Sequence, residues 1–316
     1  MCVVLIFVSI LSFVIIQLPP GDFLTSYILE LKRGGTDVDE ARIAALQRRY
    51  GLDQPLYVRY FKWITNFIRG DLGYSYMWNR PVGELIWERL LLTVVISLLS
   101  TIFVWIVAFP IGVLSALRQY SIVDYLFTAI SFIGLAVPSF MLALLVMYVG
   151  FQYFGVNVGG LFSATYQEAP WSWGKFTDLL SHLWVPVIVL GVSGTAGLVR
   201  IMRANLLDEL GKPYVVAAKA KGLDRAKLVL KYPVRIALNP FISTLGWQLP
   251  MLISGEVIVS VVLNLPTTGP LLLSALRSQD MYLAGSFVML LSIATVIGTF
   301  ISDMLLAWAD PRIRYE

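Results

Sequence analysis

The chain has 316 residues, of which 58% are apolar and 14% charged, and its mean hydropathy is +0.75. That balance is not typical of a globular domain and indicates an all-α protein that crosses a membrane several times. The formal net charge of +4 arises from segments between the apolar runs, so it indicates orientation in the membrane rather than nucleic-acid binding. The single cysteine and single histidine, Cys2 and His182, exclude a disulfide framework and a Cys- or His-cluster metal site. His182 precedes an apolar run, which favours an interfacial side chain over a metal ligand or a base.

The first 18 residues form an apolar run that we interpret as the first membrane span, although about 20 residues are needed to cross a bilayer. Residues 19–89 follow as a polar insert, with ten basic residues against nine acids from Asp22 to Arg89. Within it, Tyr57, Tyr60, Phe61, Ile64, Phe67 and Ile68 recur at helical spacing. This pattern predicts an amphipathic helix that either lies at the membrane interface or packs on the helix bundle.

Five further apolar runs predict five more spans, at residues 90–117, 125–154, 183–199, 241–265 and 281–302. Pro110 is expected to kink the first of these, and Pro138 to bend the second. In the third, Gly191, Gly194 and Gly197 allow neighbouring helices to approach closely. Six spans place both termini on one side of the membrane.

The long polar segment of the second half, residues 203–240, carries seven basic residues and three acids after Arg203. Its order predicts a helix, a break and a second helix. Pro213 suits the first position of a helix and Gly222 its end. Asp224 caps the next helix until Pro233 interrupts it. On composition alone, the segment is an ordinary cytoplasmic loop.

The positive-inside rule orients the chain with this segment in the cytoplasm. Short segments on that side hold twelve basic residues and the short outer loops hold two. The inner twelve are Arg118, Arg200, Arg203, Lys212, Lys219, Lys221, Arg225, Lys227, Lys231, Arg235, Arg312 and Arg314; the outer two are Lys175 and Arg277.

Sequence motifs of catalysis are absent. Gly211-Lys212-Pro213 lacks the leading glycine and the hydroxyl of a phosphate-binding loop, so ATP is not expected to bind this chain. One cysteine and one histidine cannot supply a nucleophile–base pair or a set of metal ligands, which excludes a membrane enzyme of those kinds. Glu256 is the only charged residue between Ile236 and Leu276, and an ionisable group within a span marks a transport pathway or a buried partner.

Four motifs resemble the permease subunits of binding-protein-dependent ABC importers, in the oligopeptide, dipeptide and nickel branch. They are Pro20-Gly21-Asp22 after the first span, the order from Tyr214 to Leu223 with Arg235-x-Ala237-Leu238-x-Pro240, the loop Leu265-Pro266-x-x-Gly269, and the ending Asp310-Pro311-Arg312-Ile313-Arg314-Tyr315. The second of these four motifs resembles the family's EAA loop. It departs from that loop at Val216, in place of the glutamate, and at Tyr232-Pro233, in place of a His-Ala pair.

The resemblance implies the type I importer fold, with one peripheral helix, the insert, a five-helix core over residues 90–310 and a cytoplasmic tail at 311–316. It implies that a short coupling helix docks on an ATPase subunit through Tyr214, Val215, Ala217, Ala218, Lys219, Ala220, Lys221, Gly222 and Leu223. Residues expected along a substrate pathway in the fifth span are Gln248, Glu256, Ser260 and Asn264.

The implied partners are a second, similar permease, two ATPase subunits that bind ATP and Mg²⁺, and an external solute-binding protein, in the inner membrane of a prokaryote. No cofactor or metal is expected in this chain. Substrates of the branch are peptides, oligosaccharides and nickel chelates, and the aromatic outer loops favour a peptide or sugar over a metal complex. The rival interpretation is an ion channel or scaffold that works without an ATPase.

Overall fold

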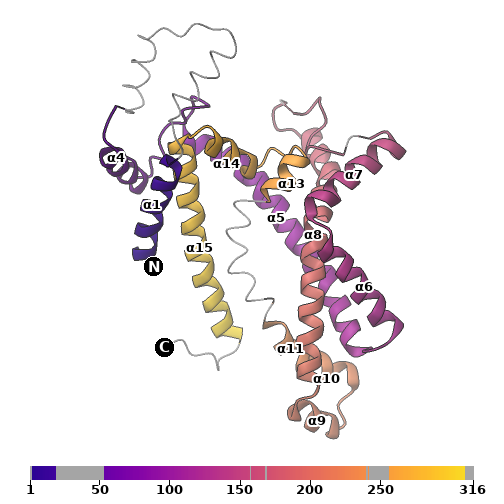
Figure 1. Cartoon of the computed structure of the whole chain (residues 1–316). Coiled ribbons are helices and arrows are strands. Elements are labelled where there is room, and N and C mark those ends of the chain that lie inside the picture. The colour runs from indigo at the N-terminus through magenta and orange to yellow at the C-terminus, as the bar shows by residue number, and fades with distance from the viewer. Residues whose placement is uncertain are drawn as a thin grey trace. The chain divides into compact units, whose positions relative to one another are not determined.

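The structure is a computed structural model of the chain and describes residues 2–18, 53–156, 158–167, 169–239, 241 and 256–309. Within these ranges the named elements are all helices (Figure 1). They are α1 (Cys2–Gln17), α4 (Leu56–Ile68), α5 (Val82–Leu117), α6 (Ile122–Ala136), α7 (Ser139–Phe154), α8 (Trp173–Leu210), α9 (Pro213–Ala220), α10 (Arg225–Lys231), α11 (Pro233–Ala237), α13 (Val257–Val262), α14 (Thr268–Arg277) and α15 (Met281–Ala309).

Three of the described helices are long and apolar enough to cross a membrane: Val82–Leu117, Trp173–Leu210 and Met281–Ile301. The pair α6 and α7 adds a fourth if it forms one broken span, and α1 is a shorter apolar helix. The predicted span 241–265 lies largely outside the described residues, so the six-span count stays a prediction. The Pro20-Gly21-Asp22 turn and the tail at 311–316 also lie outside them.

The chain divides into two compact units, the first formed by residues 1–93 and 267–296. In it, the end of the insert is fixed to the turn between α14 and α15 by Asp280. This buried carboxylate accepts hydrogen bonds from Ser75 Oγ at 2.5 Å and from the backbone N–H of Met77 at 3.1 Å. Burial raises the pKa of Asp280 despite these hydrogen bonds, which act in the opposite direction.

The second unit consists of residues 94–266 and 297–316, and in it α6, α7 and α11 all pack against α8. Two of the three predicted glycine contacts are present. A Cβ at Gly191 would collide with the ring of Phe103, and one at Gly194 would lie 3.1 Å from Val104, so α5 approaches α8 closely at both. At Gly197, no atom of the described residues lies within 4 Å of an added Cβ, so the predicted close approach is not seen there.

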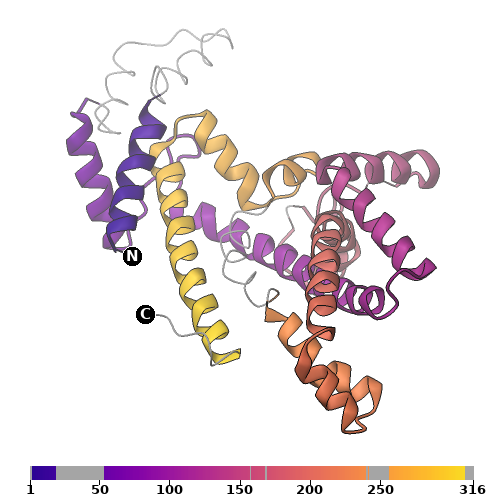
Figure 2. The ribbon, with the colours of Figure 1, turned by 60° about the horizontal axis from the view of Figure 1, so that its bottom comes forward.

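The long helix α8 extends between the two ends of this unit. Its 38 residues correspond to about 57 Å of helix, longer than the roughly 30 Å hydrocarbon core of a bilayer. The short helices α9 and α10 lie at its C-terminal end, while α7 and the loop preceding α8 lie toward its other end (Figures 1 and 2).

The two prolines predicted to distort spans behave differently. The helix α5 continues through Pro110 without interruption. At Pro138 the chain breaks, and the axes of α6 and α7 differ in direction by 96°. The predicted bend at Pro138 is therefore confirmed, and it is sharper than an ordinary proline kink because the helix ends at Ala136 and restarts at Ser139.

Candidate functional site

The short helices after α8 begin and end where the sequence predicts. Pro213 is the first residue of α9. Gly222 follows its end with φ +79°, a conformation that glycine adopts at little cost. The Asp224 side chain accepts hydrogen bonds from the backbone N–H groups of Ala226 and Lys227 at the start of α10. Pro233 begins α11. The predicted helix–break–helix is therefore present.

The nine predicted coupling residues divide between the interior and the surface. Val215 and Ala218 are buried in one core with Ala116 of α5, Met202 of α8 and Leu228 of α10. Tyr214 and Leu223 are partly buried against the same core, whereas Ala217, Lys219, Ala220, Lys221 and Gly222 are exposed. Only part of the predicted set can therefore meet another protein.

Val216 belongs to the exposed face, although the predicted set omits it. Its side chain is 61% exposed, a high value for valine on a helix packed against a core. The signal was present in the sequence, because Val216 stands where the related loops carry their glutamate.

The side chain of Tyr214 connects α9 to the end of α8. Tyr214 Oη donates a hydrogen bond to Glu209 Oε2 at 2.5 Å. Burial and the nearby Glu209 carboxylate raise the pKa of Tyr214, so its hydroxyl keeps its proton at physiological pH. Together with the shared core, this hydrogen bond holds α9 against the end of α8.

A buried ion pair near the same end of the unit was not predicted. Arg203 of α8 donates from Nε to Asp124 Oδ1 at 2.7 Å and from Nη2 to Asp124 Oδ2 at 2.8 Å. The carboxylate also accepts hydrogen bonds from Ser115 Oγ and the Tyr120 N–H. Asp124 is only 2% exposed, so every one of these bonds compensates for lost hydration. The bidentate pair links the first turn of α6 to α8.

Glu256 lies at the break between α6 and α7. It is the residue before α13, and its carboxylate accepts a hydrogen bond from Ser139 Oγ, at the first residue of α7. The side chain is nevertheless exposed on the surface of the described chain. Two helix N-termini, which carry partial positive charge, therefore meet at one carboxylate. Sequence reasoning missed Ser139, whose only signal was its position directly after Pro138.

The other predicted pathway residues are distributed around α13. Ser260 is 4% exposed and faces the interior. Asn264 follows the end of the helix with φ +52°, beside Leu263, whose carbonyl accepts a hydrogen bond from Gly160 N–H at 2.6 Å. Gln248 lies outside the described residues. The structure thus places Glu256 on the exposed surface at the break between α6 and α7, whereas Ser260 is buried.

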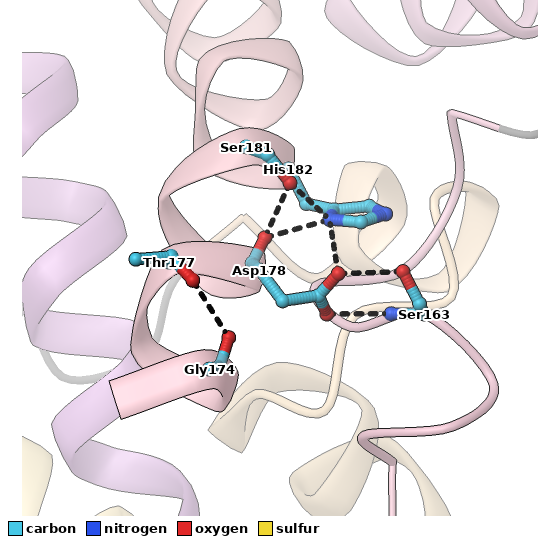
Figure 3. Close-up of polar contacts among 6 residues, drawn as sticks. All are labelled: Ser163, Gly174, Thr177, Asp178, Ser181 and His182. Atoms are coloured by element: carbon cyan, nitrogen blue, oxygen red, sulfur yellow. Dashed lines mark hydrogen bonds and ion pairs between the residues drawn. The ribbon is translucent and has the colours of Figure 1, made fainter. Parts of the chain in front are cut away.

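The loop before α8 is held to the helix by a compact set of polar contacts (Figure 3). Asp178 accepts hydrogen bonds from the backbone N–H of Ser163 at 2.8 Å and from its hydroxyl at 2.5 Å. His182 Nδ1 lies 3.8 Å from the same carboxylate. The side chain of His182 is 19% exposed and takes part in this local contact, while its predicted place at the membrane interface stays a prediction.

This architecture, with a short helix packed at the end of a long apolar helix and a broken helix pair beside a carboxylate, is compatible with a subunit of a membrane transporter. Residues 108–315 match the family described as binding-protein-dependent transport system inner membrane component. The chain belongs to that family, in the branch of the peptide permeases.

Curated relatives match almost the whole chain. It is 36% identical over 313 residues to the oligopeptide transport system permease protein AppB of Bacillus subtilis, covering 99% of this chain and 96% of the relative. It is 32% identical over 288 residues to the inner membrane ABC transporter permease protein YejB of Escherichia coli O157:H7, covering 90% and 79%. It is 30% identical over 312 residues to the glutathione transport system permease protein GsiC of Salmonella typhimurium, covering 99% and 95%.

Proposed function

We propose that this permease subunit imports peptides through the inner membrane of a bacterium and is driven by ATPase subunits that dock on the exposed face of α9. That face consists of Val216, Ala217, Lys219, Ala220 and Lys221. ATP and Mg²⁺ would be bound by the ATPase subunits, and this chain would contribute no catalytic residue. A second similar permease, a second ATPase subunit and an external solute-binding protein would complete the transporter.

The observation that carries this proposal is that α9 packs in the same core as the long helices α5 and α8. Val215 and Ala218 are buried in the same core as α5 and α8, and Tyr214 is hydrogen-bonded to Glu209. A push on the exposed face of α9 would therefore move α8 as a unit. Movement of packed helices between two arrangements is how a cavity at the membrane midplane alternates its opening.

The substrate pathway is proposed at the corner formed by Glu256 and Ser139. Broken helices at membrane depth are tolerated where they line a cavity, and they mark substrate sites in many transporters. A carboxylate at this point is complementary to the α-ammonium group of a peptide. Relatives named for oligopeptide and glutathione transport support the peptide class.

An oligosaccharide is the second candidate substrate. Trp171 and Trp173, in front of and at the start of α8, are 60% and 79% exposed, and such rings can stack on sugars. Uptake of a peptide, but not of a neutral oligosaccharide, by the complete transporter would decide for the first candidate.

Matched arginine substitutions test the docking of α9. Val216→Arg places a long cation on the exposed face, and we expect ATPase co-purification and ATP-dependent uptake in proteoliposomes to fall about tenfold or more, equivalent to at least about 1.4 kcal/mol. Ile122→Arg is the control, because Ile122 is 86% exposed but lies at the start of α6. It should retain both properties.

Ala218→Arg separates docking from folding. Ala218 is 7% exposed inside the shared core, so arginine there should lower the yield of folded permease, whereas Val216→Arg should not. Normal co-purification and uptake in Val216→Arg would contradict the docking face. Purification of the intact permease without any ATPase would favour the channel or scaffold interpretation instead.

A further inference from the structure

Within the described residues, one side of the amphipathic helix α4 packs against two apolar helices, α1 and α15. Its Trp63 is 1% exposed and donates from Nε1 to Ser286 Oγ of α15 at 3.3 Å. Tyr60 packs edge-on against Phe13 of α1, with ring centroids 5.4 Å apart, and its hydroxyl lies 2.8 Å from Ser9 Oγ. The sequence left open whether this helix lies at the membrane interface or packs on the helix bundle. These contacts show that α4 packs on neighbouring helices.

The contacts also show which part of each neighbouring helix α4 packs against. Ser286 is five residues into α15, which corresponds to about 8 Å along that helix. Ser9 is eight residues before the end of α1 at Gln17, or about 12 Å along it. These contacts lie inside the two helices and not at their ends. The helix α4 therefore packs alongside the apolar segments of α1 and α15.

Among the described residues, no side chain covers the opposite edge of its apolar face. Tyr57, Phe61 and Ile68 share one side of the helix and are 66%, 63% and 79% exposed. An apolar groove of about 320 Å³ runs between this edge and α1. It is lined by residues of both helices and of the segments beside them: Ile10, Phe13, Val14, Gln17, Leu18, Leu56, Tyr57 and Tyr60. The exposed apolar surface of α4 is therefore continuous with that of α1.

The remaining side of α4 is basic. Arg59 and Lys62 lie on it, and Arg69 follows at the end of the helix. A wide apolar face with cations opposite it is the pattern of helices that lie in the membrane interface, with apolar side chains among acyl chains and cations among phosphates.

We propose that α4 lies within the outer leaflet, where phospholipid acyl chains cover Tyr57, Phe61 and Ile68 and fill the groove beside α1, and headgroup phosphates contact the basic side. This inference rests on the membrane location in the proposed function. Continuity with the apolar surface of α1 and the depth of the Ser9 and Ser286 contacts select lipid over a soluble partner. The expected insert would then be partly a membrane-embedded element.

The test uses fluorescent labels on the complete transporter in lipid vesicles. Cys2→Ser removes the only cysteine, and a bimane label is then attached at Phe61→Cys, Lys62→Cys or Phe7→Cys in separate proteins. Phe61 and Lys62 are chain neighbours about 100° apart on the helix, so they compare two faces of α4 at one position along its axis. Phe7 is 66% exposed on α1 and serves as the lipid reference.

Two quenchers read the surroundings of each label. A phospholipid with a doxyl group near its glycerol end should quench most of the fluorescence at Phe61→Cys, while iodide in the buffer should quench Lys62→Cys more strongly. Quenching of Phe61→Cys mainly by iodide would place that face in water and overturn the inference. Protection of Phe61→Cys from both quenchers would mean that a protein covers it, which also overturns the inference.

The reference label separates this inference from the proposed function. If Phe7→Cys is quenched by the lipid and Phe61→Cys by iodide, the proposal for α4 fails while α1 remains in the membrane. If iodide reaches both, the membrane location itself fails. In vesicles of phosphatidylglycerol, Lys62→Glu with Arg69→Glu should reduce lipid quenching of the Phe61→Cys label, and unchanged quenching would refute the phosphate contacts.

Discussion

A single carboxylate, Glu256, combines the two properties expected of a substrate contact. It is exposed at the break between α6 and α7, and it is held in place by Ser139. A carboxylate that is oriented yet accessible can bind a cation without a large loss of side-chain entropy. The proposed pathway therefore predicts that this side chain influences which substrates pass.

We predict that Glu256→Gln lowers uptake of peptides with a free α-ammonium group about tenfold or more, since hydrogen bonds to charged groups contribute about 1.5–3 kcal/mol. Uptake of the N-acetylated peptides should change far less, because they lack that charge. Ser139→Ala is the control, as it keeps the carboxylate and removes only its positioning contact. An unchanged preference between the two peptide classes in Glu256→Gln, measured in proteoliposomes, would remove Glu256 from the pathway.

At this scale, sequence reasoning identified Glu256 because an isolated charge within an apolar run is conspicuous. It could not identify Ser139 as the partner, since a serine next to a proline is common and the two residues are 117 positions apart. Asp124 and Arg203 were missed for the same reason. Their contact depends on how two helices far apart in the sequence pack against each other.

Among the helices, local signals and tertiary packing contribute differently to α9. Its beginning and end follow from Pro213 and Gly222, which act through backbone geometry within a few residues. Which face is buried follows from Ala116 and Met202, which belong to other helices. The sequence therefore predicted where α9 lies along the chain, and the structure was needed to separate Val216 from Ala218.

The helix α8 shows the limit of hydropathy in the same way. The predicted span was 183–199, and the helix extends from Trp173 to Leu210. Hydropathy marks the apolar part of a helix, whereas backbone hydrogen bonds continue through its polar ends. The ten-residue helix α14 was missed altogether, since it is short and lies in a segment interpreted as an outer loop.

The link between α6 and α8 is predicted to depend on the ion pair of Asp124 and Arg203. Removing one partner of a buried pair typically costs about 3–5 kcal/mol, and Arg203 is partly exposed, so we expect about 3 kcal/mol for Arg203→Met. Its apparent melting temperature in detergent should fall accordingly. Arg200→Met is the control, because Arg200 is exposed and contacts only the face of the Phe132 ring among the interactions described for it.

The double variant Asp124→Asn with Arg203→Met isolates the pair, because asparagine keeps an oxygen that can accept from the Ser115 hydroxyl and the Tyr120 N–H. Most of the loss in Arg203→Met comes from leaving a buried carboxylate without its counter-charge, so removing that carboxylate as well should recover much of the stability. Equal melting temperatures for Arg203→Met and Arg200→Met would show that the pair does not hold α6 to α8.

For the whole molecule, the composition predicted a helical membrane protein, and both the fold and the family confirm that class. The number of spans is harder to predict, because a sharply bent pair of helices has the same hydropathy whether it crosses the membrane or returns to its starting side. With a 96° break, α6 and α7 are compatible with either topology by length and composition.

Labelling at three exposed positions distinguishes the two topologies. In Cys2→Ser, we place single cysteines at Gln119 before α6, Thr165 after α7 and Lys219 in α9. If α6 and α7 form one broken span, an impermeant maleimide added to intact cells should label Thr165→Cys and leave Gln119→Cys and Lys219→Cys unlabelled until the membrane is opened. Labelling of Gln119→Cys and Thr165→Cys from the same side would show a re-entrant pair. Labelling of Lys219→Cys from outside would contradict the orientation set by the basic residues and, with it, the docking of any cytoplasmic ATPase on α9.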